Sequence, residues 1–218
     1  VKSDNDIYDS RNNCNAIIET TTNTLIAGCR NTIIPNSVTA IGGHVFEGCI
    51  NLNSLTIPNS VSEIGTYAFS SCKSLTSVSI PQNVATIKTW AFAGCSSLSS
   101  IIIPNSVTSI ESFAFISCSS LVSLTLGNSV ASIEGSAFSK CNSLASVYIA
   151  TTTPPILGIN TFLNSTPTCY IPCGTLEAYE ASDWAEQVGK FVEECENVLP
   201  DSTHCIFYTS TDGNIVEP

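Results

Sequence analysis

The 218-residue sequence has few basic residues, only two histidines and no methionine. Seven Lys and Arg against 18 Asp and Glu give a net charge of −11. Binding to nucleic acid or to an anionic membrane surface needs Lys and Arg, so we expect neither as a partner. The scarcity of histidine leaves little for general acid–base chemistry, and no metalloprotease, P-loop, dinucleotide or nucleophile-elbow motif occurs. We therefore expect neither enzyme activity nor a cofactor.

Long apolar runs and metal-ligand motifs are also missing. No run approaches the roughly 18 residues of a membrane span, and no signal peptide follows Val1, so we expect a processed or truncated product. Cys169 and Cys173 have poor zinc spacing and no nearby histidine. The oxygen-rich segments 4–6 and 212–214 are too short for a calcium loop. We expect no bound metal.

The dominant feature of the sequence is a repeat with a period of 23 residues. Five units cover residues 35–149 without an insertion, and each unit reads P-x2-V-x2-I-x4-F-x2-C-x2-L-x2-[LVI]-x-[IL], except that Gly127 replaces proline in the fifth. Several columns keep one residue type in every unit: Ile41, Ile64, Ile87, Ile110 and Ile133; Phe46, Phe69, Phe92, Phe115 and Phe138; Cys49, Cys72, Cys95, Cys118 and Cys141.

A fixed period of this length predicts a β-rich solenoid of the leucine-rich-repeat kind, a right-handed superhelix. Leu55 and Ile57 alternate inward, which predicts a short strand in each unit, and stacked strands form a parallel sheet. The segment with Val38 and Ile41 predicts a second short piece, extended or turn-like. The proline after each strand lacks an N–H, so it ends the hydrogen bonding between neighbouring strands. Each coil is too thin to bury itself, so its neighbours complete the core.

The two ends of the array depart from the period. Segments 16–19 and 24–27 flank a polar turn and predict a β-hairpin in an N-terminal cap over residues 1–34. Residues 150–196 predict a degenerate sixth coil and a helical cap, because apolar residues between Thr175 and Glu194 fall roughly on one helical face. We therefore expect one leucine-rich-repeat domain over 1–196. Residues 197–218 would be a tail or the start of a following module.

The cysteine column has two interpretations. Buried free thiols are favoured, because free cysteine is among the most buried residue types. Disulfides or a metal between coils are the alternative, although equivalent side chains point the same way rather than at each other. A bridge between Cys14 and Cys29 across the N-terminal hairpin also stays open at this point.

The repeat unit resembles the bacterial-surface-protein-A type (BspA-like) leucine-rich repeat, also called the Treponema pallidum type. The resemblance is carried by Ile57-Pro58-Asn59-Ser60-Val61, Ile64-Gly65, Ala68-Phe69, Cys72 and Leu75, and it covers all five units. Segment 8–19 is similar to the N-terminal cap, and segment 170–184 to the end of the array, in such proteins of Bacteroides-like bacteria. Departures are Gly127 for proline, and Lys88, Glu111 and Glu134 where earlier units have glycine.

The resemblance implies a secreted or cell-surface bacterial protein without enzyme activity. It further implies roles in adhesion, in binding host matrix proteins such as fibronectin or in co-aggregation, and no fixed binding residues. We expect a monomeric binding solenoid that contacts proteins, including extracellular matrix proteins, or glycans. A structural spacer that presents another module, with no ligand of its own, is the alternative.

Two columns are candidate binding surfaces. The outward strand positions form a hydroxyl-rich, nearly uncharged concave face, on which Ile102 and Tyr148 are the strongest candidates. A second column carries a ring in four consecutive units, His44, Tyr67, Trp90 and Phe113, followed by Ser136. Rings at such positions can stack on sugars or anchor a protein contact, or they pack against neighbouring coils. Tyr67, Trp90, Phe113, Ile102 and Tyr148 are thus the candidate ligand-binding residues.

Overall fold

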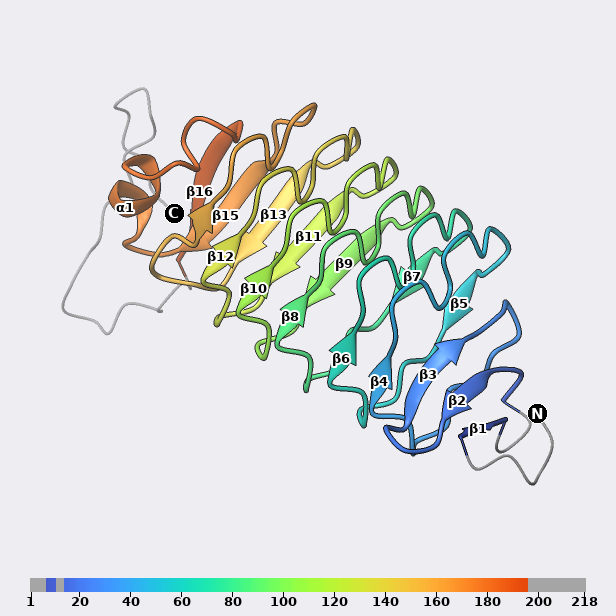
Figure 1. Cartoon of the computed structure of the whole chain (residues 1–218). Helices are drawn as coiled ribbons and strands as arrows, with labels where there is room; N and C mark the ends of the chain where they lie inside the picture. The colour runs from blue at the N-terminus through green and yellow to red at the C-terminus, as the bar shows by residue number, and fades with distance from the viewer. Residues whose placement is uncertain (1–6, 11–13, 196–218) are drawn as a thin grey trace, which may run out of the picture.

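The computed structural model describes residues 7–10 and 14–195 (Figure 1). The expectations for segments 4–6 and 212–214 and for the tail 197–218 concern residues outside these ranges. Within them, the chain winds into a stack of similar coils, and its strands line up in two rows along the array (Figure 1).

The first strand row contains one short strand from each of six coils. Neighbouring strands pair in parallel, apart from a break between the second and the third, and Ile110 lies level with Ile87 and Ile133. Its members are β4 (Ala40–Ile41), β6 (Glu63–Ile64), β8 (Thr86–Ile87), β10 (Ser109–Ile110), β12 (Ser132–Ile133) and β14 (Ile156–Leu157).

The second strand row contains seven strands, also parallel. Ser123 lies level with Ser100 on one side and with Ser146 on the other, so the register repeats the sequence period. Its members are β5 (Ser54–Leu55), β7 (Ser77–Val78), β9 (Ser100–Ile103), β11 (Ser123–Leu126), β13 (Ser146–Ile149), β15 (Thr168–Pro172) and β16 (Lys190–Glu194). The predicted parallel β-solenoid is therefore confirmed, and the second piece of each unit, extended or turn-like in the prediction, is a short strand such as β4.

The core between the two rows is a series of stacked identical side chains. The rings of Phe46 to Phe138 follow one another at centroid distances of 5.1 to 5.2 Å and lie within 10° of parallel. Phe162 extends the stack at 5.9 Å, and Trp184 ends it, tilted, at 5.6 Å. Stacked side chains of one type fill equal volumes in every coil, which explains why these columns are uniform.

Between the first strand row and the core, the chain turns twice through left-handed conformations. One column of positive φ includes His44, Tyr67, Trp90, Phe113, Ser136 and Asn160, and another includes Gly48, Ser71, Gly94, Ser117, Lys140 and Asn164. Backbone N–H groups here donate to the following coil, as Phe69 N–H does to Ala91 O at 2.8 Å. These hydrogen bonds join the turns of neighbouring coils.

The cysteine column consists of free thiols, and four of its five members are fully buried. Each of those four donates to a phenylalanine carbonyl in the preceding coil, as Cys95 Sγ does to Phe69 O at 3.2 Å. Cys49, in the first coil, is partly exposed. The favoured buried-thiol interpretation is confirmed for Cys72, Cys95, Cys118 and Cys141.

At the N-terminus, β2 (Ile17–Glu19) and β3 (Thr24–Ala27) pair antiparallel, and β1 (Tyr8–Asp9) pairs with β2. Strand β3 then pairs in parallel with β4, which joins this segment to the first strand row. Cys14 and Cys29 are both free, so the bridge considered between them does not form. The Sγ atoms hydrogen-bond separate backbone carbonyls, those of Ala16 and Asn15.

At the C-terminus, the predicted helix over 175–194 is wrong. Helix α1 is confined to Leu176–Glu180, and β16 extends the second strand row beyond β15. Gly189 explains the difference, because its N–H donates to Pro167 O and an added Cβ would lie 2.7 Å from Thr166 O. The backbone therefore runs closely along the sixth coil at Gly189 and continues as β16 from Lys190. A disulfide joins Cys173 to Cys195 across this segment.

Candidate binding surfaces

The first candidate surface is the outward face of the second strand row. Serine or threonine occupies one position per strand from β5 to β15, and the neighbouring position becomes larger and less polar toward the C-terminus. Ile102 is 68% exposed, although isoleucine favours the interior. The register then places Thr125, Tyr148 and Tyr170 successively beside it. No charged side chain interrupts this row between Ile102 and Tyr170.

Tyr170 is a member of this surface that the sequence prediction missed. Its ring stacks on Tyr148 at a centroid distance of 4.7 Å and an interplanar angle of 12°. Tyr170 follows Tyr148 by 22 residues instead of 23, because the sixth coil is irregular. The strand-end sequence Ile171-Pro172 was the signal that could have given this register. We define the strand-face patch as Ile102, Thr125, Tyr148 and Tyr170.

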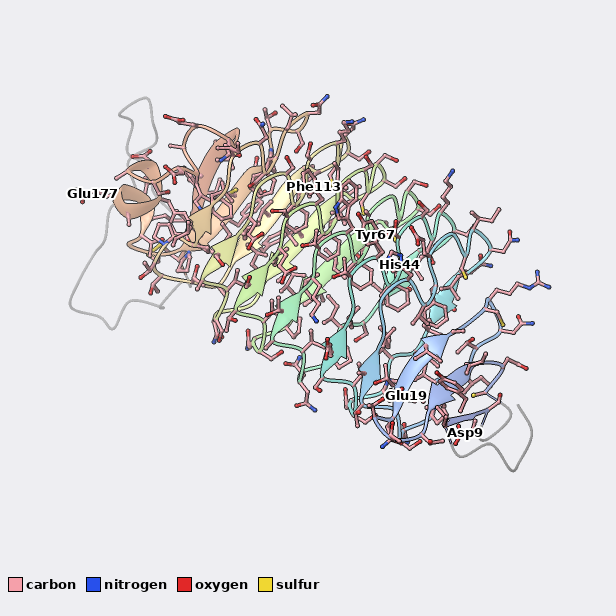
Figure 2. All side chains as sticks on the ribbon, viewed as in Figure 1. Asp9, Glu19, His44, Tyr67, Phe113 and Glu177 are labelled. Carbon is pink, nitrogen blue, oxygen red and sulfur yellow. A yellow bond between two sulfur atoms is a disulfide. The ribbon has the colours of Figure 1, made fainter. Side chains whose placement is uncertain are left out.

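The second candidate surface is the aromatic column, which we define as His44, Tyr67, Trp90 and Phe113. Successive ring centroids are 4.8, 5.7 and 4.7 Å apart, and all three pairs are stacked. Figure 2 shows His44, Tyr67 and Phe113 in one row along the array. The structure therefore brings together the three rings predicted as ligand-binding residues, Tyr67, Trp90 and Phe113. Ile102 and Tyr148 lie in the second strand row.

Mutual stacking limits what the aromatic column can bind. A sugar ring normally packs against an open aromatic face, but here each inner ring covers the faces of its neighbours. Tyr67, Trp90 and Phe113 are partly exposed, and His44 is 60% exposed. The column thus presents ring edges, together with the open face of the terminal imidazole.

The backbone under the aromatic column is unfavourable for bulky side chains. Tyr67, Trp90 and Phe113 have φ values of 59° to 62°, a region in which non-glycine residues are uncommon. The same turn holds Ser136 and Asn160 in later coils, so the conformation belongs to the coil rather than to the ring. Stacking offsets part of the cost, since aromatic pairs gain about 0.5–1.5 kcal/mol beyond burial. Because coils without a ring adopt the same turn, this conformation does not by itself mark the rings as a binding site.

Nucleophilic and metal chemistry have little support in the described ranges. Burial, followed by the nearby Cys29, raises the pKa of the Cys49 thiol, which disfavours the thiolate that a nucleophile needs. Cys173, Glu193 and Cys195 are the one group there with atoms close enough to hold a metal. The disulfide occupies both sulfurs, and the Glu193 carboxylate accepts the N–H groups of Thr175 and Leu176 at 2.8 and 2.9 Å.

Solved structures similar to this chain are bacterial leucine-rich repeat proteins. A leucine rich cell surface protein from Faecalibacterium prausnitzii A2-165 is 34% identical over 67% of this chain and 40% of its own, with a TM-score of 0.62. The pneumococcal vaccine antigen PcpA is 20% identical over 89% of this chain and 50% of its own, with a TM-score of 0.74. The T. pallidum leucine rich repeat protein is 24% identical over 89% and 97%, with a TM-score of 0.55.

The second and third similarities show the fold alone, and this chain spans half or less of the first two proteins. No curated protein matches the chain in sequence. None of the helices in the described ranges is long and apolar enough to cross a membrane. Residues 26–145 match six copies of the BspA type leucine rich repeat region, more than half of the chain. The chain therefore belongs to the BspA-type leucine-rich repeat family, as its 23-residue unit indicated.

Proposed function

We propose that this chain is a non-enzymatic, extracellular binding and adhesion solenoid that contacts other proteins. The observation that carries the proposal is the strand-face patch, in which Ile102 is exposed and Tyr148 and Tyr170 are partly exposed on hydrogen-bonded strands. Tyrosine is enriched at interface hot spots because it offers a large, stiff contact area with a polar tip. The surrounding hydroxyl groups suit a wet, polar rim.

The family supports this location and class of function. The F. prausnitzii relative is described as a cell surface protein, and we carry that location to this chain as part of the proposal, either by secretion or by surface display. The partner we expect is an extracellular matrix protein such as fibronectin, bound by a monomer of this chain. Solenoids provide extended surfaces suited to such contacts.

The strand-face patch is tested by capture of immobilised matrix proteins with single variants. Tyr148→Ala and Tyr170→Ala should each weaken capture at least tenfold, since truncation of a hot-spot tyrosine costs about 2 kcal/mol or more. Ile102→Ser should weaken it similarly, whereas Ile50→Ser, an exposed isoleucine off this face, should not. Equal loss from Ile102→Ser and Ile50→Ser would contradict a specific surface.

The aromatic column needs a separate test. If the ring edges bind the partner, Tyr67→Ala combined with Trp90→Ala abolishes capture while the melting temperature barely moves. A large fall in melting temperature would instead assign the rings to packing between coils. If the strand-face variants also left capture unchanged, neither surface would bind a partner. The structural spacer would then be favoured, with the stacked rings serving to hold adjacent coils together.

A further inference from the structure

A polar pocket of about 380 Å³ opens at the N-terminal end of the aromatic column, beside the first strand row. Its walls include Gly43, His44, Glu63, Thr66 and Lys88. The volume is at the lower end of the range for small-molecule sites, which is about 300–1,000 Å³. None of these residues belongs to the strand-face patch.

The pocket exists because of glycines in the first two units. Gly42 and Gly65 occupy the position at which later units have Glu111 and Glu134. Those two carboxylates fold onto the preceding coil, where Glu111 accepts the N–H and hydroxyl of Thr89, both at 2.8 Å. The side chains thus cover the equivalent surface in later coils, whereas the first two coils leave it open.

The pocket offers both hydrogen-bond donors and acceptors. Lys88 forms an ion pair with Glu63 across neighbouring coils, and both groups stay partly exposed. Within the described residues, the Thr66 hydroxyl makes no hydrogen bond. The His44 ring is fixed by Tyr67, stacked on one face, and by the Glu47 carboxylate, 2.7 Å from Nδ1. Its other face carries no ring in the part of the chain that the structure describes.

These groups select for a neutral, hydroxyl-rich ligand. The opposite charges of Lys88 and Glu63 compensate each other, so neither an anion nor a cation gains from the pair. A purely apolar ligand would desolvate both charges without compensation. Sugar hydroxyls donate to carboxylate and accept from ammonium, while the apolar face of a sugar ring can pack on imidazole. We propose that this pocket binds one unit of a neutral oligosaccharide.

The experiment is a titration of the full ¹⁵N-labelled chain with four neutral trisaccharides, maltotriose, cellotriose, chitotriose and mannotriose, at millimolar concentration. At least one should shift the backbone amides of Gly43, Gly65 and Thr66, and leave those of Tyr148 and Tyr170 unmoved. Lys88→Met and Thr66→Val should each weaken that binding about tenfold, because a lost hydrogen bond to a sugar hydroxyl leaves a polar group unpaired.

Lys73→Met is the matched control, since Lys73 is an exposed lysine outside the pocket. The Lys88 variant should keep its fold because partly exposed ion pairs contribute only about 0–1 kcal/mol. The absence of amide shifts with all four sugars, or equal effects of Lys88→Met and Lys73→Met, overturns the proposal. Protein capture through the strand-face patch is unaffected by that outcome, so the two proposals fail independently.

Discussion

At the scale of single residues, the reactivity of the cysteine thiols depends on whether they are buried or exposed. Cys72, Cys95, Cys118 and Cys141 are fully buried, whereas Cys29 is exposed. We expect a thiol reagent to label Cys29 rapidly in the native protein and the four buried thiols only after unfolding. Mass spectrometry of labelled peptides measures this directly. Rapid native labelling of Cys95 or Cys118 would contradict the structure.

The buried thiols also predict how stability depends on pH. Burial is the largest cause that raises the pKa of Cys72 and of Cys169 to about 12, from an ordinary value of 9.0. Between these two values the unfolded chain loses protons that the folded chain keeps, so the free energy of unfolding must fall as pH rises. Urea unfolding at a series of pH values from about 8 upward should show this decline.

The matched variant for this pH dependence is Cys72→Ala with Cys169→Ala. It should be less stable at neutral pH, because it loses buried volume, but its stability should fall less steeply in the alkaline range. An unchanged slope would show that these two thiols do not cause the decline. Tyr179 contributes in the same direction, because burial raises its pKa to about 12.

Residue columns were the most predictable part of the molecule. A 23-residue step identifies which side chains share an environment, and the phenylalanine and cysteine columns lie buried as expected. The left-handed φ of Tyr67 and Trp90 could not be predicted, because bulky aromatic residues give no propensity signal for that conformation. For the same reason, the sequence did not show that the rings would cover each other's faces.

At the scale of elements, the last coil ends the array with side chains in place of backbone. Gln187 Oε1 accepts the Thr161 N–H at 2.8 Å, and Gln187 Nε2 donates to Gly158 O at 3.0 Å. Trp184 Nε1 donates to Pro155 O at 2.8 Å. In earlier coils, the N–H groups equivalent to that of Thr161 donate within their own coil, as Ala137 N–H does to Glu134 O. The carbonyl equivalent to Pro155 O instead accepts a backbone N–H from the next coil, as Ala131 O does from Ile156. The Trp184 indole thus replaces the backbone of a missing neighbour, and the Gln187 amide adds two hydrogen bonds to the sixth coil.

We expect Gln187→Leu to destabilise the chain by about 1–3 kcal/mol, because the Thr161 N–H loses its partner, whereas Gly158 O keeps the Thr161 hydroxyl. Hydrogen exchange of the Thr161 amide should accelerate, which locates the effect in the sixth coil. Gln82→Leu is the control, since Gln82 is an exposed glutamine in a turn between coils. Similar losses in both variants would mean that Gln187 has no special role at this end.

The disulfide between Cys173 and Cys195 joins the two ends of the C-terminal segment that contains Gln187. Cys173→Ser with Cys195→Ser should cost about 2–4 kcal/mol by releasing this loop. Exchange protection should fall in α1 and β16, with little change from β7 to β11. Reductant should lower the melting temperature of the parent chain, because it breaks the disulfide, and should leave that of the double variant unchanged. Cys29→Ser, which removes an exposed free thiol, should leave stability unchanged.

The C-terminal segment also shows where sequence reasoning fails for an element. Tyr179 and Trp184 are buried as the apolar pattern required, but only Leu176–Glu180 is helical. The spacing of apolar residues predicts which side chains face the core. Both a helix and an irregular segment can bury the same side chains, so the spacing does not distinguish between them. The close approach of Gly189 to Thr166 decides between them, and that contact is not visible in one sequence.

At the scale of the whole molecule, every interior coil presents the same surface to both of its neighbours. Removal of residues 85–107, one complete period, joins Val84 to Thr108 and should leave a folded, shorter solenoid. Circular dichroism and a cooperative melting curve measure this. A deletion one residue longer shifts every later column out of register and should unfold the chain. Equal behaviour of the two deletions would contradict the nearest-neighbour organisation.

Net charge is distributed unevenly over the same length. Residues 151–218 hold ten acidic residues and one basic residue, so nearly all of the −11 lies at or beyond the last coils. The repeats themselves are almost neutral. Contacts along the strand-face patch should therefore depend little on salt.

The parallel register of β9, β11 and β13 gives the array a distinct mechanical behaviour. The hydrogen bonds that join these strands point along the array, so tension between its two ends loads one interface at a time. A coil adds roughly 4.8 Å to the folded length. Once pulled free, its 23 residues extend to roughly 75 Å. Each released coil thus becomes about fifteen times longer, and an array pulled at its two ends would extend one coil at a time.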